Sequence, residues 1–139
     1  MDIINPSGKQ TLKVETDFCG RKLGLEVNRV GFRTTSSVVV TYGDTVVLGS
    51  VVVGSKPVVQ DFFPLSIDYE EKYYASGKIS SSKFIKREGK PSDNAVLIGR
   101  LIDRPIRPLF PKGYRQEIQV VATVLSMDPN FRPDVIGMI

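Results

Sequence analysis

Residues 37–53 read Ser-Val-Val-Val-Thr-Tyr-Gly-Asp-Thr-Val-Val-Leu-Gly-Ser-Val-Val-Val. Two runs rich in β-branched residues, 37–42 and 45–53, flank Gly43-Asp44, a turn pair suited to positive φ. This pattern predicts a β-hairpin. Its nearly continuous valines indicate strands that are buried on both faces.

Four further stretches show the alternation or the β-branched content expected of strands: residues 9–18, 23–30, 64–69 and 118–127. A helix is predicted to begin with Ser92 or Asp93 as its N-cap and to run through Asp103. Residues 133–139 read as a second helix with an abrupt end, which indicates a truncated piece of a longer protein. The order of five strands, a helix, a strand and a helix predicts an α+β fold, with helices packed on one side of a mostly antiparallel or mixed sheet.

The composition limits the class of protein. With 139 residues, 41% of them hydrophobic and 24% charged, the chain can bury one core and is one domain or a large piece of one. The longest apolar runs are far too short to cross a bilayer, so no membrane partner is expected.

Cys19 is the only cysteine, and the chain has no histidine. A disulfide within the chain, the usual zinc sites and the Ser-His or Cys-His catalytic pairs are therefore excluded. A reducing cytoplasm fits this composition. We expect Cys19 to be a small buried or half-buried apolar residue and not a reactive thiol.

The positive charge is concentrated in one segment. Residues 78–115 hold ten of the nineteen Lys and Arg residues against three acids, a net charge of +7, whereas the rest of the chain sums to −3. Aromatic residues, among them Phe84, Phe110 and Tyr114, are interleaved with these cations. Such a segment attracts a polyanion and can stack on bases. In the alternative, the segment is a solvated basic face that only keeps the protein soluble.

Three arginines stand at helical spacing. Arg100, Arg104 and Arg107 fall within about 60° of arc at roughly 100° per residue, and such guanidiniums bind phosphate oxygens bidentately. Pro105 is expected to kink or stop the helix and to displace Arg107 from this row. In the alternative, Asp103 pairs with the arginines; because one carboxylate cannot neutralise three of them, we expect one arginine to be used in this way. The apolar residues of the other face are expected to dock on the sheet: Ala95, Ile98, Leu101 and Ile102.

A long loop precedes this helix. Residues 73–91 lose all periodicity, and within them Phe84 and Ile85 lie among cations that include Lys86 and Arg87. Loops of this length are usually functional or disordered. An aromatic residue exposed among cations favours stacking on a nucleobase. Equally, Phe84 and Ile85 could tuck under the loop as its own small core, and the sequence leaves both readings open.

Four stretches resemble the start of the bacterial polynucleotide phosphorylase family: Gln60-Asp-Phe-Phe-Pro-Leu, Tyr73-Tyr-Ala-Ser-Gly-Lys-Ile, Phe84-Ile-Lys-Arg-Glu-Gly-Lys-Pro-Ser and Leu97-Ile-Gly-Arg-Leu-Ile-Asp-Arg-Pro-Ile-Arg-Pro-Leu-Phe-Pro. The resemblance covers essentially the whole chain. It implies a ribonuclease-PH-like fold (ribosomal protein S5 domain 2-like). Residues 1–139 would be the first of two such domains, incomplete at its C-terminus, with the second catalytic domain and the KH and S1 domains absent from this chain.

The resemblance also implies an activity. Enzymes of this family degrade single-stranded RNA, including mRNA, from 3′ to 5′ by phosphorolysis, release nucleoside diphosphates and can run in reverse. They use inorganic phosphate as co-substrate and Mg²⁺ or Mn²⁺, whose ligands would lie outside this segment. We therefore expect no catalytic and no metal-binding residue here, and this segment alone should be inactive. The full-length protein would be a cytoplasmic homotrimer, in some cases within an RNA-degradation complex.

Two sets of residues match family features that bind RNA. Residues 84–87, Phe-Ile-Lys-Arg, match a channel loop that carries two aromatics and two arginines; here Ile85 replaces the second aromatic and Lys86 the first arginine. The arginines that match Arg100, Arg104 and Arg107 belong to a helix that faces the composite active site and guides the RNA backbone. The resemblance thus implies an RNA-binding role for the following residues: Phe84, Ile85, Lys86, Arg87, Arg100, Arg104 and Arg107.

Two alternatives remain at this point. The same domain occurs in non-catalytic RNA-binding or ring-scaffold subunits of exosome-like assemblies. A weaker alternative is an independent phosphoprotein- or nucleotide-binding domain, which would bind a small anion tightly with no preference for a chain of nucleotides.

Overall fold

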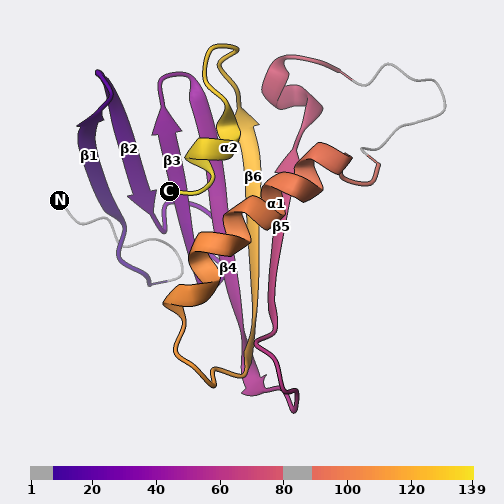
Figure 1. Cartoon of the computed structure of the whole chain (residues 1–139). Helices are drawn as coiled ribbons and strands as arrows, with labels where there is room; N and C mark the ends of the chain where they lie inside the picture. The colour runs from indigo at the N-terminus through magenta and orange to yellow at the C-terminus, as the bar shows by residue number, and fades with distance from the viewer. Residues whose placement is uncertain (1–7, 80–88) are drawn as a thin grey trace.

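The computed structural model describes residues 8–79 and 89–139 and contains one six-stranded sheet. Its elements are, in chain order, β1 (Leu12–Phe18), β2 (Arg21–Val27), β3 (Ser36–Tyr42), β4 (Thr45–Pro57), β5 (Leu65–Glu71), the 3₁₀ turn η1 (Tyr73–Ser76), α1 (Asp93–Ile106), the 3₁₀ turn η2 (Arg107–Leu109), β6 (Gln116–Ser126) and α2 (Pro133–Ile136). The strands lie in the order β1-β2-β3-β4-β6-β5 (Figure 1). All neighbours are antiparallel except β5 and β6, which are parallel. The predicted element order and the mixed sheet are confirmed.

The predicted central hairpin is β3–β4. Tyr42 pairs with Thr45 across the turn, where Gly43 has a φ of 58° that glycine adopts without strain. Burial on both faces is confirmed for β3, in which the neighbouring residues Val39 and Val40 are both buried. It is wrong for the end of β4, where Val52 is 46% exposed.

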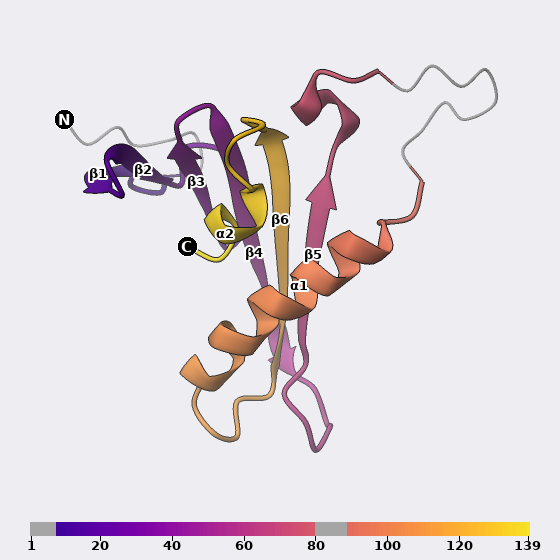
Figure 2. The same ribbon diagram turned by 45° about the horizontal axis from the view of Figure 1, so that its top comes forward.

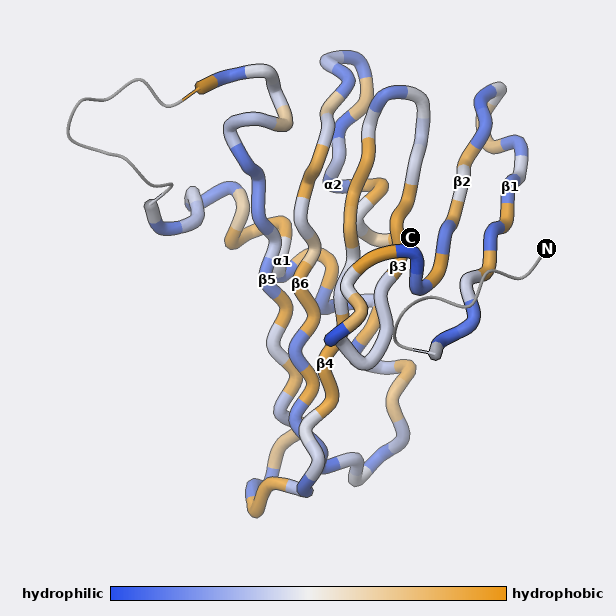
Figure 3. Tube along the Cα trace, turned by 180° about the vertical axis from the view of Figure 1, so that it is seen from behind, coloured by the Kyte–Doolittle hydropathy of each residue, from blue (hydrophilic) through white to orange (hydrophobic). Residues whose placement is uncertain are grey.

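Both helices cover the same face of the sheet, as predicted. α1 runs obliquely across the sheet, and the short α2 lies beside it (Figures 1 and 2). In the view from behind, the strands lie in front and no helix covers them (Figure 3). One apolar core joins the strands to both helices through the following buried residues: Leu23, Val40, Tyr42, Val47, Tyr69, Ala95, Ile98, Ile102, Ala122, Val124 and Ile136. Within residues 8–79 and 89–139, neither helix is long and apolar enough to span a membrane.

α1 begins where the sequence predicts and ends later. The Ser92 hydroxyl accepts a hydrogen bond from the backbone N–H of Ala95 at 3.1 Å, which identifies Ser92 as the N-cap. The helix stops at Ile106, one residue after Pro105, and a 3₁₀ turn follows, so the expectation that the helix kinks or stops at this proline is confirmed to within one residue. Arg107 still has helical φ and ψ, and its N–H donates to the carbonyl of Asp103, so its backbone is not displaced from the row of arginines.

Leu101 does not dock on the sheet and is 46% exposed, so this prediction is wrong. Ala95, Ile98 and Ile102 are buried as expected, and the fourth buried residue of α1 is Gly99. Leu101 lies about 100° of helix rotation from Ile102, on the outer side of α1.

Gly99 lets α1 approach β5 closely. A Cβ at this position would lie 3.1 Å from the carbonyl oxygen of Ile67. That oxygen belongs to the backbone of a paired strand and cannot move aside as the end of a side chain can. Gly99 therefore fixes the distance between α1 and β5.

Replacing Gly99 with alanine is expected to destabilise the fold by about 1–3 kcal/mol through this contact. At an unobstructed helical position the same change stabilises by about 1 kcal/mol. Urea denaturation measures the effect, with Gly89→Ala as a control outside the helix, where the added Cβ meets nothing within 4 Å among the described residues. A Gly99→Ala protein as stable as the original would show that α1 can shift away from β5.

Cys19 is exposed, so the expectation that it is buried or half-buried is wrong. It occupies the tip of the β1–β2 hairpin, where Phe18 pairs with Arg21. Cys19 and Gly20 have φ values of 49° and 79°, as in the two-residue turns that suit the twist of antiparallel strands. The turn places the Cys19 side chain outside the core.

Candidate nucleic-acid interface

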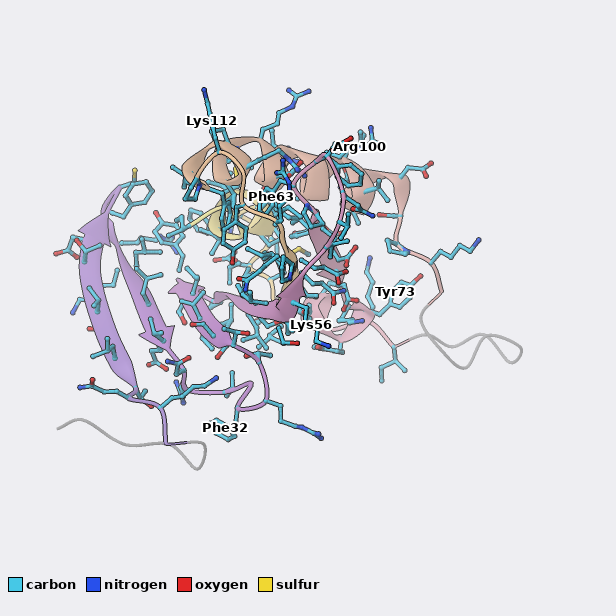
Figure 4. The ribbon with its side chains drawn as sticks, turned by 90° about the horizontal axis from the view of Figure 1, so that it is seen from below. Phe32, Lys56, Phe63, Tyr73, Arg100 and Lys112 are labelled. Atoms are coloured by element: carbon cyan, nitrogen blue, oxygen red, sulfur yellow. The ribbon has the colours of Figure 1, made fainter. Side chains whose placement is uncertain are left out.

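Arg100 and Arg104 lie one turn apart on α1, and both are exposed. Figure 4 shows Arg100 on the helix side of the molecule. Neither guanidinium makes a hydrogen bond or an ion pair within residues 8–79 and 89–139. The two residues are about 6 Å apart along the helix axis, and each guanidinium can receive phosphate oxygens.

Arg107 has a different environment, because each of its three guanidinium nitrogens has a partner within the fold. Nε donates to both carboxylate oxygens of Asp103 at 3.1 Å, and Nη2 lies 2.9 Å from Oδ1. Nη1 and Nη2 also donate to the carbonyl oxygens of Phe63 and Leu65, each at 3.2 Å. The expectation that Asp103 pairs with one arginine is confirmed, and that arginine is Arg107. Of the three predicted arginines, Arg100 and Arg104 are therefore unpaired among the described residues, and Arg107 is bound within the fold.

Exposed leucines lie beside the unpaired arginines. Leu97 is 63% exposed and Leu101 46% exposed, on the outer side of α1. Leu97 precedes Arg100 by three residues, and Leu101 precedes Arg104 by three, a spacing that makes side chains neighbours on a helix. This surface is therefore cationic and apolar together, and it can bind phosphates while contacting ribose or base.

An aromatic cluster lies at the C-terminal end of α1. The ring of Phe63 is 4.8 Å from that of Phe110 and 5.6 Å from that of Tyr114, and Phe110 and Tyr114 are 5.8 Å apart. We expected Phe110 and Tyr114 to be interleaved among the cations as stacking groups, but they pack on each other and on Phe63. Phe63 was missed as their partner, although it stands in the quoted Gln60-Asp-Phe-Phe stretch; the carbonyl that it offers to Arg107 leaves no sequence signal.

The predicted channel loop falls largely outside the described residues, and with it Phe84, Ile85, Lys86 and Arg87. Its described ends frame a cleft between η1 and the N-terminus of α1, which Tyr73, Lys78 and Lys90 help to line. Tyr73 is 53% exposed. The loop thus leaves and re-enters the fold beside the N-terminal turn of the arginine-bearing helix.

Tyr69 forms part of this cleft, yet its side chain is buried and, among the described residues, its hydroxyl has no hydrogen-bond partner. Burial raises the pKa of the Tyr69 hydroxyl above its usual value, and the nearby Glu71 carboxylate adds to this effect. The hydroxyl therefore stays protonated at neutral pH.

Tyr69→Phe is expected to leave stability unchanged or to raise it by about 1 kcal/mol, because it removes a buried hydroxyl that has no hydrogen-bond partner in the described part of the chain. The matched control is Tyr42→Phe, which removes a hydroxyl that donates to the carbonyl of Phe18 at 3.1 Å. We expect the control to lose about 1 kcal/mol. If thermal unfolding shows equal losses for the two variants, the Tyr69 hydroxyl has a partner after all.

The sequence comparison identifies the family. The domain described as "3′ exoribonuclease family, domain 1" matches residues 20–136, which include strands β2 to β6 and both helices, α1 and α2. The chain belongs to the 3′ exoribonuclease family. Its arginine-bearing helix lies wholly within the matched region.

Relatives in this 3′ exoribonuclease family carry a more specific name. The chain is 53% identical over 124 residues to the polyribonucleotide nucleotidyltransferase of Clostridioides difficile, covering 88% of this chain and 18% of that protein. It is 55% identical over 124 residues to the enzyme of the same name from Thermomicrobium roseum, covering 88% of this chain and 16% of that protein. The chain therefore spans less than a fifth of the length of these relatives. The resemblance to the N-terminal ribonuclease-PH-like domain of polynucleotide phosphorylase is confirmed.

Solved structures share the fold of this chain. An Archaeoglobus fulgidus exosome with RNA bound to the active site matches with a TM-score of 0.52 and 21% identity, over 76% of this chain and 44% of that chain. Rice (Oryza sativa) Rrp46 matches with a TM-score of 0.55 and 14% identity, over 76% and 45%. At these identities the likeness concerns the fold, and the predicted ribonuclease-PH-like fold is confirmed.

The metal implied by the resemblance has no fitting ligands in the described part of the chain. Residues 8–79 and 89–139 contain no group of three or more Cys, Asp or Glu side chains that could hold a metal ion. Asp103 is occupied by Arg107.

Proposed function

We propose that this chain is the first ribonuclease-PH-like domain of a polynucleotide phosphorylase and forms part of its RNA channel. The whole enzyme would degrade single-stranded RNA, including mRNA, from 3′ to 5′ by phosphorolysis and release nucleoside diphosphates. The observation that carries this proposal is the pair Arg100 and Arg104, exposed and unpaired in the described structure, in a chain more than half identical to polyribonucleotide nucleotidyltransferases.

Arg100 and Arg104 would hold phosphates of the RNA backbone. Guanidiniums bind phosphate oxygens bidentately, and a fixed helix presents both in one orientation. Leu97 and Leu101 would contact the sugars or bases between them. Holding the upstream strand in this way places the terminal phosphodiester in register for reaction, which is a positioning effect.

The reacting groups would come from outside this chain. Inorganic phosphate would attack the phosphorus of the terminal phosphodiester and form a new P–O bond, while the bond from that phosphorus to the 3′ oxygen of the preceding nucleotide breaks. A nucleoside diphosphate would leave, and the 3′ oxygen would take the proton that the phosphate gives up and become the new 3′ hydroxyl of the RNA. A second ribonuclease-PH-like domain would supply the catalytic residues and the ligands of Mg²⁺ or Mn²⁺. KH and S1 domains, a homotrimeric ring, an RNA-degradation complex and a cytoplasmic location belong to the same proposal.

The remaining predicted contacts are retained as part of the proposal. Residues 84–87 would grip the unpaired strand with one aromatic ring, Phe84, and the cations Lys86 and Arg87, with Ile85 in place of a second ring. The RNA-binding role of Arg107 stays a prediction, although its contacts with Asp103, Phe63 and Leu65 favour a role within the fold.

The experiment is an assay of phosphate-dependent release of ADP from poly(A). We expect the full-length protein to release ADP when inorganic phosphate and Mg²⁺ are present, and residues 1–139 alone to release none. RNA binding without any release by the encoded protein would favour the scaffold-subunit alternative. Binding of small anions without preference for RNA would favour the independent anion-binding domain.

A further inference from the structure

We propose that Asp103 and Arg107 form a clamp that sets the position of Arg100 and Arg104, so that Arg107 supports RNA binding through α1 and not by touching RNA. This inference rests on the proposed function. It makes Arg107 and Asp103 positioning residues and leaves Arg100 and Arg104 as the contacts.

The hydrogen bonds of Arg107 leave little capacity for a phosphate. Its three nitrogens all donate within the fold, to the Asp103 carboxylate and to the carbonyls of Phe63 and Leu65. A phosphate that bound Nε and Nη2 bidentately would displace a carboxylate already bound by three contacts of 2.9–3.1 Å. This exchange is unfavourable, because removing one partner of a hydrogen bond leaves the other unsatisfied.

The clamp ties the end of α1 to the start of β5. Phe63 and Leu65 flank Pro64, whose carbonyl accepts the N–H of Ile118 on β6 at 2.9 Å. Arg107 therefore joins the helix to a segment that is already hydrogen-bonded into the sheet. The Phe63 ring also lies beneath Arg107, 5.8 Å from the guanidinium carbon, and is held by Phe110 and Tyr114.

A second fixed point lies two turns earlier. Gly99 packs against the carbonyl of Ile67, which is on the same strand and the same face as Leu65. Gly99 and Arg107 are about 12 Å apart along the helix axis. Two fixed points on one strand determine both the rotation and the axial position of a helix. Arg100 follows directly after the first point, and Arg104 lies between the two.

Removing the charge of Asp103 distinguishes the clamp from a direct contact between Arg107 and RNA. If Arg107 touched RNA and Asp103 only competed for it, removing the Asp103 charge would strengthen binding, since both the freed cation and the lost anion favour a polyanion. If the pair is a clamp, the same change weakens binding, because α1 loses one of its two fixed points. The two roles predict effects of opposite sign.

The test measures binding of a fluorescent single-stranded oligo(A) to the 139-residue chain across a salt series, with the near-isosteric variant Asp103→Asn. The clamp predicts binding weaker by about tenfold, the factor expected when one charge-assisted contact is lost. Tighter or unchanged binding overturns the clamp. Asp44→Asn, at the exposed tip of the β3–β4 turn, controls for removing one negative charge elsewhere.

Arg107→Gln supplies a second readout, the salt dependence of binding. Loss of a phosphate contact changes this dependence, whereas loss of a positioning residue does not. A single phosphate contact contributes about 0.7 to the slope of log K against log salt for a single strand. The clamp predicts weaker binding with an unchanged slope, and a slope reduced by about 0.7 overturns it. If Arg107→Gln fails to fold, Arg107→Lys takes its place, because lysine keeps the charge and loses the planar guanidinium. The clamp predicts the same weakening of binding for this variant, and full retention of affinity overturns it.

A different result would show that the proposed function itself is wrong. If the unmodified chain binds no oligo(A) at low salt, the RNA-binding surface is wrong, whatever the clamp does. Hydrogen exchange then tests the clamp without RNA: faster exchange of the α1 backbone amides in Asp103→Asn supports it, and unchanged exchange overturns it.

Discussion

Replacing Arg100 and Arg104 together with alanine is expected to weaken binding of single-stranded RNA to this chain by about a hundredfold at low salt. Each arginine would make a charge-assisted contact that contributes about 1.4 kcal/mol or more, a factor of ten in affinity. Both side chains are exposed, and neither has an ion-pair or hydrogen-bond partner in residues 8–79 and 89–139, so the stability of the fold should change by less than about 0.5 kcal/mol. Fluorescence anisotropy measures the affinity, and urea denaturation measures the stability.

The matched control for this double variant is Lys22→Ala with Arg33→Ala. It removes the same number of positive charges from exposed positions on β2 and on the loop before β3, away from α1. We expect a loss of no more than a fewfold, from the reduced long-range field alone. Equal losses in the two double variants would mean that RNA is attracted by net charge and that α1 has no special part.

Ile102→Ala is expected to lower the free energy of unfolding by about 2–5 kcal/mol, because the change leaves a cavity in the core. Ile102 is 1% exposed, and its Cδ1 atom lies 3.6 Å from the position of a Cβ at Gly137, so the side chain joins α1 to the segment after α2. Domains of this size have stabilities of about 5–15 kcal/mol, so the variant would lose a large part of its stability.

The neighbouring residue provides the control. Leu101 lies on the same helix but is 46% exposed, and Leu101→Ala should cost less than about 1 kcal/mol. Urea denaturation of the two variants under one set of conditions gives both values. Similar losses would indicate that the outer side of α1 is packed in solution, contrary to the arrangement described above.

Local sequence patterns predicted most of the fold. The β-branched runs around Gly43-Asp44 predicted the hairpin, and Ser92 predicted the start of α1, because turns and caps depend on a few adjacent residues. The position of β6 between β4 and β5 was not predicted, since it depends on pairing between segments that are distant in the chain. Leu101 and Cys19 were misplaced because both are apolar, and their exposure is set by the rotation of a helix and by a turn at positive φ.

The candidate site was predicted in part. Helical spacing predicted that Arg100, Arg104 and Arg107 start from one face, and the charge count predicted that Asp103 engages one of them. Sequence alone could not choose which, because Arg100 and Arg107 both lie within one turn of Asp103. The choice depends on two carbonyls about forty residues away, which hold Arg107 at the start of β5.

The most direct test of the central claim compares a single-stranded oligo(A) with a matched duplex in binding to the unmodified chain and to the Arg100→Ala/Arg104→Ala variant across a salt series. We predict that the unmodified chain prefers the single strand, and that the variant binds more weakly with a salt slope smaller by about 1.4, the value for two lost phosphate contacts. An unmodified chain with no preference for the single strand, or a variant with an unchanged slope and affinity, would contradict a role of α1 in binding the RNA backbone.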